Sequence, residues 1–139
     1  MKQRPARTIT RDKKGVAAIE FGMTAPLFLL LIVGIAQCGI ALWYQFGMEH
    51  GAEMAARCAT VTPTDPNCDT AAHLQSYAAQ QTYGAPIPVS AFTVSLASTC
   101  DSNGTIKGNR INASYVYKFA PLVYQKAKVT LTARSCFPT

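Results

Sequence analysis

The chain has 139 residues, of which 49% are hydrophobic and only 14% are charged, whereas an average soluble domain is about 25% charged. This length allows one small domain, and the apolar residues are concentrated between Val16 and Tyr44, where Glu20 is the only charged side chain. The remainder is polar and rich in Thr, Ser and Ala. It is too small to bury a large hydrophobic core unless disulfides or partner proteins stabilise it.

Basic residues are concentrated in front of the apolar stretch. Residues 1–15 contain six Lys/Arg and one Asp, whereas residues 45–139 contain seven Lys/Arg and five Asp/Glu. Lys and Arg beside a membrane span mark its cytoplasmic side. We therefore expect a basic cytoplasmic leader, 1–15, and an exported C-terminal part. This topology accounts for the basic charge without a nucleic-acid partner.

The apolar segment of about 21–44 predicts a single transmembrane helix. It rises about 36 Å at ~1.5 Å per residue, which exceeds the roughly 30 Å hydrocarbon core of a bilayer. Trp43 and Tyr44 end the segment, as aromatic residues do at membrane interfaces. A cleaved secretory signal has a shorter apolar core of about 7–15 residues, and Gln37 before Cys38 disfavours a lipoprotein cleavage site.

Helical character continues beyond the span. Small and apolar residues recur there at helical spacing, namely Met48, Ala52, Ala55, Ala56 and Ala59. Glu53 lies four residues before Arg57, the favourable order for an ion pair on a helix. We expect one long helix over 16–60, which Pro63 and Pro66 terminate.

The rest of the chain, 61–139, predicts an exported domain that begins with a second helix. This helix covers about 71–83, and its first turn is expected to be capped by Asp69 or Thr70. Proline and glycine residues follow it and end it.

Three strands are expected after the second helix, because apolar and polar residues alternate around 92–96, 111–119 and 129–133. Asp101–Gly104 and the pair Gly108-Asn109 have turn-forming chemistry and separate the first two strands. The predicted fold class is α+β. A long N-terminal transmembrane helix extends into a small exported domain, which has a second helix and a three-stranded antiparallel sheet.

Four of the five cysteines follow the apolar stretch, where an exported domain meets oxidising conditions. They are Cys58, Cys68, Cys100 and Cys136. Four cysteines allow three pairings, of which we favour a local bridge, Cys58–Cys68, and a long-range one, Cys100–Cys136. Cys38 lies within the apolar stretch and is expected to remain free. A zinc site is disfavoured, because no C-x-x-C pair exists and neither histidine has regular spacing to the cysteines.

Catalytic motifs are missing from the sequence. It contains no phosphate-binding glycine loop, no H-E-x-x-H and no G-x-S-x-G. Cys68 near His73 could form a thiol–imidazole pair, but a disulfide half-cystine beside a surface histidine is the simpler interpretation. We expect no enzymatic activity, no cofactor and no small-molecule substrate.

One short pattern stands out where the leader meets the apolar stretch. Basic residues run up to Gly15, Val16 follows, and Glu20-Phe21 is the fifth and sixth position after the glycine. A carboxylate inside a membrane span costs about 2.5–3.5 kcal/mol at mid-bilayer and is a functional candidate. In the alternative interpretation, Glu20 lies near the headgroups and pairs with a leader lysine, Lys13 or Lys14.

The pattern resembles the processing site of type IV prepilins, and the Glu-aromatic pair is similar to that of Flp, or tight-adherence, pilins. Over 13–60 and 111–134 the chain resembles the TadE-like family of pilus-assembly proteins. The elements that carry this resemblance are Glu20-Phe21, Pro26, the following Leu/Ile run, the segment 52–59, the strand 113–118, the segment 119–122 and the strand 128–133.

The resemblance implies a minor pseudopilin of a tight-adherence pilus in the bacterial inner membrane, with a periplasmic C-terminal domain. It implies cleavage between Gly15 and Val16 by a prepilin peptidase. Such a cut would expose an amine on Val16, and pairing of Glu20 with the amine of a neighbouring subunit would set the axial register between helices. Its partners would be other pilins or pseudopilins, pilus-assembly proteins and the lipid bilayer. An uncleaved single-pass accessory protein is the main alternative, and a membrane-tethered thiol enzyme is another.

Overall fold

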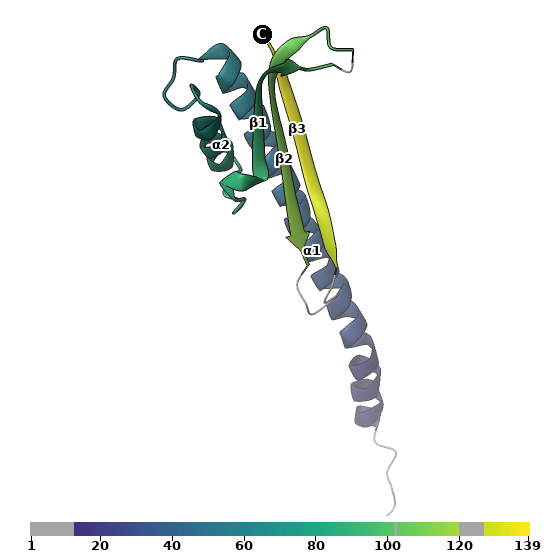
Figure 1. Cartoon of the computed structure of the whole chain (residues 1–139). Coiled ribbons are helices and arrows are strands. Elements are labelled where there is room, and N and C mark those ends of the chain that lie inside the picture. Colours follow the sequence, from purple (N-terminus) through teal and green to yellow (C-terminus); the bar gives the residue numbers. More distant parts are fainter. Residues whose placement is uncertain (1–12, 102, 120–126) are drawn as a thin grey trace, which may run out of the picture. The chain divides into compact units, whose positions relative to one another are not determined.

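The computed structural model describes residues 13–101, 103–119 and 127–139, and it confirms the α+β fold (Figure 1). Its elements are α1 (Lys13–Val61), α2 (Ala71–Gln80), the short 3-10 helix η1 (Val89–Ala91), and the strands β1 (Phe92–Thr99), β2 (Lys107–Lys118) and β3 (Lys128–Pro138). The chain divides into two units, of which the first ends at Ala36 and the second is Gln37–Thr139.

The first unit is the N-terminal part of α1, and most of its described side chains are exposed. Phe21 and Leu27 are 72% exposed and Met23 is 77% exposed. Among the described residues, one helical segment, Gly15–Val61, is long and apolar enough to cross a membrane, and its most apolar part is not buried at all. A helix that is apolar all round and unburied requires a lipid or protein environment.

The second unit is built on the C-terminal part of α1. The residues with helical spacing in the sequence are all buried, which confirms that face as the core; they are Met48, Ala52, Ala55, Ala56 and Ala59. Leu74 of α2 and Phe92 and Ile111 of the sheet complete the core. On the opposite side, the expected pair forms, with Arg57 Nη2 2.8 Å from Glu53 Oε1.

Two glycines allow the chain around α2 to approach α1 closely. A Cβ atom at Gly47 would lie 2.5 Å from the carbonyl oxygen of Thr82, and one at Gly51 would overlap the carbonyl oxygen of Ala78. Both neighbours are backbone atoms, which have no rotamer to change. The absence of a side chain at these two positions therefore sets the distance between the two segments.

The sheet is antiparallel with the order β1–β2–β3. In β2 buried or half-buried residues that face the core alternate with more exposed ones. The core-facing residues are Ile111, Ala113, Tyr115 and Tyr117. The sheet lies along α1 within the second unit (Figure 1), because Asn109 contacts Ala59 while Tyr117 contacts Gln37. Strand β2 thus runs antiparallel to this part of the helix.

Two boundaries differ from the sequence expectation. Helix α2 ends at Gln80 instead of residue 83, because Tyr83 (φ 52°) and Gly84 (φ 74°) adopt left-handed backbone conformations. Gly108 and Asn109, expected in a turn, lie inside β2 and are buried. A Cβ at Gly108 would lie 2.5 Å from the Cys100 sulfur. Glycine is therefore required there for close packing and not for a turn.

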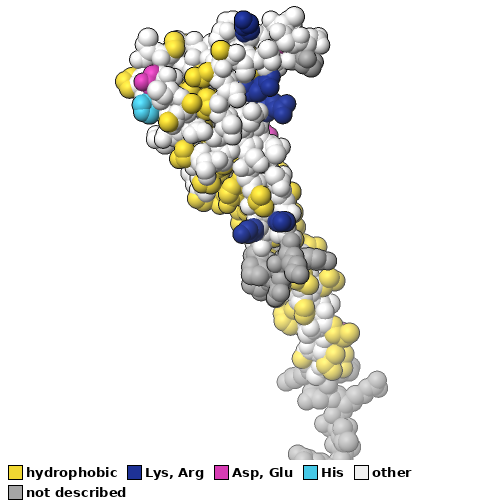
Figure 2. Space-filling model, in the orientation of Figure 1, with side chains coloured by type: hydrophobic (Ala, Val, Ile, Leu, Met, Phe, Trp, Pro, Cys, Tyr) yellow, Lys and Arg dark blue, Asp and Glu magenta, His cyan; other side chains and the backbone are white. Residues whose placement is uncertain are grey.

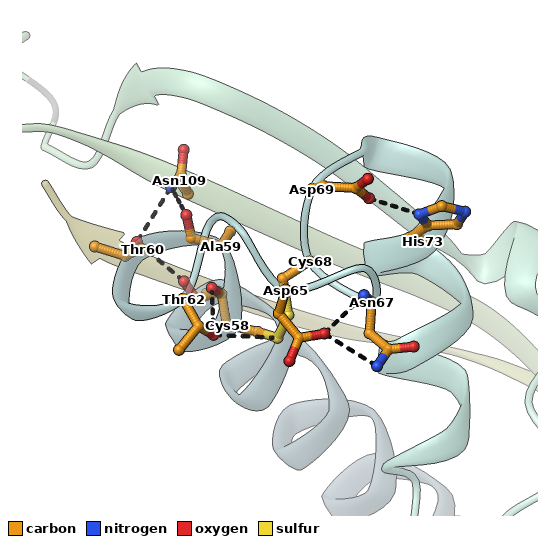
Figure 3. The surroundings of a disulfide bond; sticks show 11 residues. Cys58, Ala59, Thr60, Thr62, Asp65, Asn67, Cys68, Asp69, His73 and Asn109 are labelled. Atoms are coloured by element: carbon orange, nitrogen blue, oxygen red, sulfur yellow. Dashed lines mark hydrogen bonds and ion pairs between the residues drawn. A yellow bond between two sulfur atoms is a disulfide. The ribbon is translucent and has the colours of Figure 1, made fainter.

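Asn109 joins the end of α1 to the sheet. Its Nδ2 donates to the Ala59 carbonyl oxygen at 3.0 Å and lies 3.1 Å from Thr60 Oγ1 (Figure 3). Its Oδ1 accepts from the Ala97 N–H at 3.1 Å. Ala97 has φ 51° and lies where the β1–β2 register shifts. A single buried amide thus satisfies a helix-end carbonyl and a strand irregularity.

Two disulfides link parts of the second unit. Cys58 near the end of α1 is bonded to Cys68 in the following loop (Figure 3). Cys100, which directly follows β1, is bonded to Cys136 of β3. These are the two pairs favoured from the sequence, and in each pair the Cα atoms are 5.6 Å apart. Cys38 is free and exposed.

Candidate processing and assembly segment

The predicted cleavage residues lie in the first turns of α1. The helix starts at Lys13 instead of Val16, so Gly15 and Val16 are helical and exposed. The first four N–H groups of a helix have no partner within it, and glycine in a helix interior costs about 1 kcal/mol relative to alanine. Hydrolysis between these residues requires the first turn to unwind, and both features make that unwinding easier.

Glu20 lies one helical turn after Val16, and its side chain is exposed. Positions i and i+4 share a face, so the carboxylate and a new amine at Val16 would be neighbours. Thr24 Oγ1 donates to the backbone oxygen of Glu20 at 3.0 Å, a bond that does not involve the carboxylate. The side chains of Lys13 and Lys14, the alternative partners of Glu20, lie outside those that the structure describes. Among the described side chains, none forms an ion pair with Glu20.

Phe21 and the turn after it form an apolar surface beside Glu20. A shallow hollow there is lined by Phe21, Thr24, Ala25, Phe28 and Leu29. Hydrophobic side chains are visible along the N-terminal part of α1 in Figure 2. The apolar groove suits contact with lipid or with another helix, and a carboxylate beside it needs a polar or charged partner if it lies inside a membrane.

The alternative thiol–imidazole pair does not form. Cys68 is bonded to Cys58, and the neighbouring histidine makes a different contact, with His73 Nδ1 2.6 Å from Asp69 Oδ1. This hydrogen bond lowers the pKa of Asp69. Thr70, and not Asp69, caps α2 by accepting from the His73 N–H. Within the described residues, no group of three or more His, Cys, Asp or Glu could hold a metal ion.

Sequence reasoning missed an aromatic cluster at the Gln37 end of the second unit. The ring centroid of Tyr44 lies 5.4 Å from those of both Tyr115 and Tyr117, and the Tyr117 hydroxyl donates to Gln37 Oε1 at 3.1 Å. The alternating tyrosines of β2 were visible in the sequence. Their contact with a helix about seventy residues earlier had no local signal.

The N-terminal pattern is shared with a known family. The family model of TadE-like proteins matches residues 15–57. Over these residues the chain is similar to TadE-like proteins. The match begins at Gly15, includes Glu20 and Phe21, and ends at Arg57, so the C-terminal resemblance over 111–134 lies outside it. No curated protein and no solved structure matches the chain.

The TadE-like segment relates the chain to pilus assembly, and proteins of this kind are not known as enzymes. It coincides with the structural feature that a membrane anchor needs, the unburied apolar part of α1. The matched residues also continue past Gln37 into the second unit. The shared pattern thus covers both the apolar part of the helix and the part that packs in the folded domain.

Proposed function

We propose that this protein is a minor pseudopilin, or assembly component, of a tight-adherence type IV pilus. Helix α1 anchors it in the bacterial inner membrane, with the basic leader in the cytoplasm and the second unit in the periplasm. The observation that carries the proposal is the TadE-like match, which begins at Gly15 and covers the unburied apolar helix. The Lys/Arg surplus before that helix supports the orientation.

A prepilin peptidase is the first proposed partner. Water hydrolyses the peptide bond between Gly15 and Val16, which leaves a carboxylate on the leader and an amine on Val16. Glycine suits the residue before the cut, because its backbone unwinds readily and no side chain obstructs the peptidase. A Cβ at Gly15 has no neighbour within 4 Å among the described residues, so the protein's own packing does not require glycine there.

Glu20 is the proposed register residue. The Val16 amine is protonated near neutral pH, and it lies about 6 Å along the helix from Glu20 at ~1.5 Å per residue. In a bundle of helices the carboxylate pairs with the amine of a neighbouring subunit. Such a pair offsets the cost of a charge in the membrane and fixes the axial position of one helix against the next.

N-terminal sequencing of the protein from its native host tests the processing step. The wild-type protein should begin at Val16. Gly15→Leu should retain the leader, which appears as a heavier product on a gel. Gly22→Leu is the matched control, because a Cβ there also has open space around it, and its product should be cleaved normally. A wild-type protein that begins at Met1 contradicts the processing step and supports the uncleaved accessory protein.

Pilus assembly tests the role of Glu20. Glu20→Ala should be cleaved and inserted but should reduce assembled pili at least tenfold, because the register pair is lost. Glu49→Ala removes an exposed carboxylate farther along the same helix and should leave assembly near the wild-type level. Normal pilus numbers with Glu20→Ala would refute the register role even where cleavage is found.

A further inference from the structure

The β2–β3 ladder ends on two lysines that lie directly opposite each other. Lys118 pairs with Lys128 in the strand register, and both side chains are exposed. Like charges in a direct cross-strand pair destabilise a sheet. The preceding pair on this sheet face, Val116 with Thr130, is uncharged. Among the described side chains, no carboxylate forms an ion pair with either lysine.

The same end of the second unit carries a group of aromatic side chains. Tyr117 is the neighbour of Lys118, and its ring centroid lies 5.2 Å from that of Phe119 and 5.4 Å from that of Tyr44. Trp43 contacts Tyr44 edge-on, with the centroids 5.7 Å apart, and is 43% exposed. Aromatic rings combined with Lys or Arg are typical of proteins at the level of lipid headgroups.

The chain connects this end of the unit directly to the proposed membrane anchor. The Tyr117 hydroxyl contacts Gln37, the first residue of the unit, and α1 continues from there into the unburied apolar residues without a break. The segment 16–36 rises about 31 Å at ~1.5 Å per residue, which is enough to cross a hydrocarbon core of about 30 Å. This span ends earlier than the 21–44 predicted from the sequence, because residues 37–44 belong to the second unit. Residues 37–44 are then at headgroup depth.

We propose that Lys118 and Lys128 form a docking site for anionic lipid headgroups on the periplasmic surface of the membrane. The inference rests on the proposed anchoring by α1 and adds a second contact between the domain and the bilayer. Headgroup phosphates supply a negative counter-charge, which no described residue provides to the lysine pair through an ion pair. Trp43, which is 43% exposed, and the half-buried Phe119 add the apolar and amphipathic surface that favours this depth. Lys and Arg side chains are visible on the presented face of the domain in Figure 2.

Lysine acetylation of the full chain in vesicles tests this docking. The protein is reconstituted into phosphatidylcholine vesicles with and without about one-third phosphatidylglycerol, and a water-soluble reagent acetylates exposed lysines. Lys107, at the opposite end of β2, serves as an internal reference in the same molecule. The acetylation rates of Lys118 and Lys128 relative to Lys107 should fall about threefold or more in the anionic vesicles. The protection should vanish near 1 M salt, where the screening length is about 3 Å.

Two variants make the test specific. Lys128→Gln should weaken the protection of Lys118, because one of the two adjacent charges is lost, whereas Lys107→Gln should leave that protection unchanged. If Lys128→Gln leaves the protection of Lys118 unchanged, as Lys107→Gln should, the proposal that the two lysines form one site is wrong.

Flotation of the vesicles separates failure of docking from failure of anchoring. A protein that floats with both vesicle types but shows equal relative rates is anchored without headgroup docking, and the inference is wrong. A protein that floats with neither refutes the anchoring as well, and the inference falls with it. Protection that is equally strong in pure phosphatidylcholine also overturns the inference, since a zwitterionic surface supplies no net negative charge.

Discussion

Asp101 organises the start of the β1–β2 connection through hydrogen bonds to its carboxylate. The Ile106 N–H donates to Oδ1 at 2.9 Å, the Thr105 N–H donates to Oδ2 at 3.1 Å, and the Thr105 hydroxyl also donates to Oδ2. These donors favour the ionised form, and they lower the pKa of Asp101 to about 2. The residue follows Cys100, so the same carboxylate orders the chain beside a disulfide.

The low pKa of Asp101 predicts how stability changes in acid. A carboxyl whose pKa is lower in the folded protein contributes stability above its unfolded pKa, 3.8 here, and loses it as pH falls through about 2. Between about pH 4 and pH 2 the wild-type protein should therefore lose stability more steeply than Asp101→Asn, which cannot titrate. Urea midpoints in detergent at several pH values measure this difference. Asn103→Ala, in the same loop, should keep the wild-type slope, and parallel wild-type and Asp101→Asn curves would contradict the prediction.

Among the elements, α1 depends on small residues where it meets the segment around α2. A Gly→Ala change inside a helix normally stabilises it by up to about 1 kcal/mol. At Gly51 the added methyl group would overlap the Ala78 carbonyl oxygen, so we expect Gly51→Ala to destabilise the second unit by about 1–3 kcal/mol. Chemical denaturation followed by circular dichroism measures this. Gly39→Ala is the control, since its Cβ meets nothing within 4 Å; it should be neutral or stabilising. An equal response to the two changes would show that this packing is not tight.

The elements themselves were predictable from local patterns, and their contacts were not. Helical spacing identified α1 and its buried stripe, and alternation identified the three strands, because both signals depend on neighbours within a few residues. Asn109 carries turn chemistry in the sequence. Its amide instead meets Ala59, 50 residues earlier in the chain, and no local pattern reports such a contact.

The two candidate sites also differ in whether they can be recognised from the sequence. Gly15 and Glu20 lie five positions apart, so their pattern is visible along the chain. The pair of Lys118 and Lys128 exists only because the β2–β3 register brings them opposite each other. A shift of that register by one residue would separate them and turn the side chains of β3 to the other face. A site that depends on register becomes visible only in the folded sheet.

For the whole molecule, the disulfides and the membrane topology are linked. One bridge ties the end of α1 to the next loop, and the other joins β1 to β3 across β2. Each contributes about 2–4 kcal/mol, which matters for a domain whose core consists largely of alanine. Such bridges persist only in an oxidising compartment, so a cytoplasmic orientation of the second unit would remove both sources of stability.

The last prediction tests this orientation and the bridges together. An alkaline phosphatase reporter fused after Thr139 should be active, because it folds only after export. The non-reduced protein from the same cells should contain two disulfides and one free thiol, at Cys38.

Replacing Lys13 and Lys14 by Glu removes most of the leader's charge surplus, so it should reduce reporter activity and raise the number of free thiols. Lys107→Glu, on the second unit, should change neither, because Lys and Arg direct insertion only near the ends of a span. An inactive wild-type reporter with five free thiols would place the domain in the cytoplasm, and the pseudopilin assignment would fail with it.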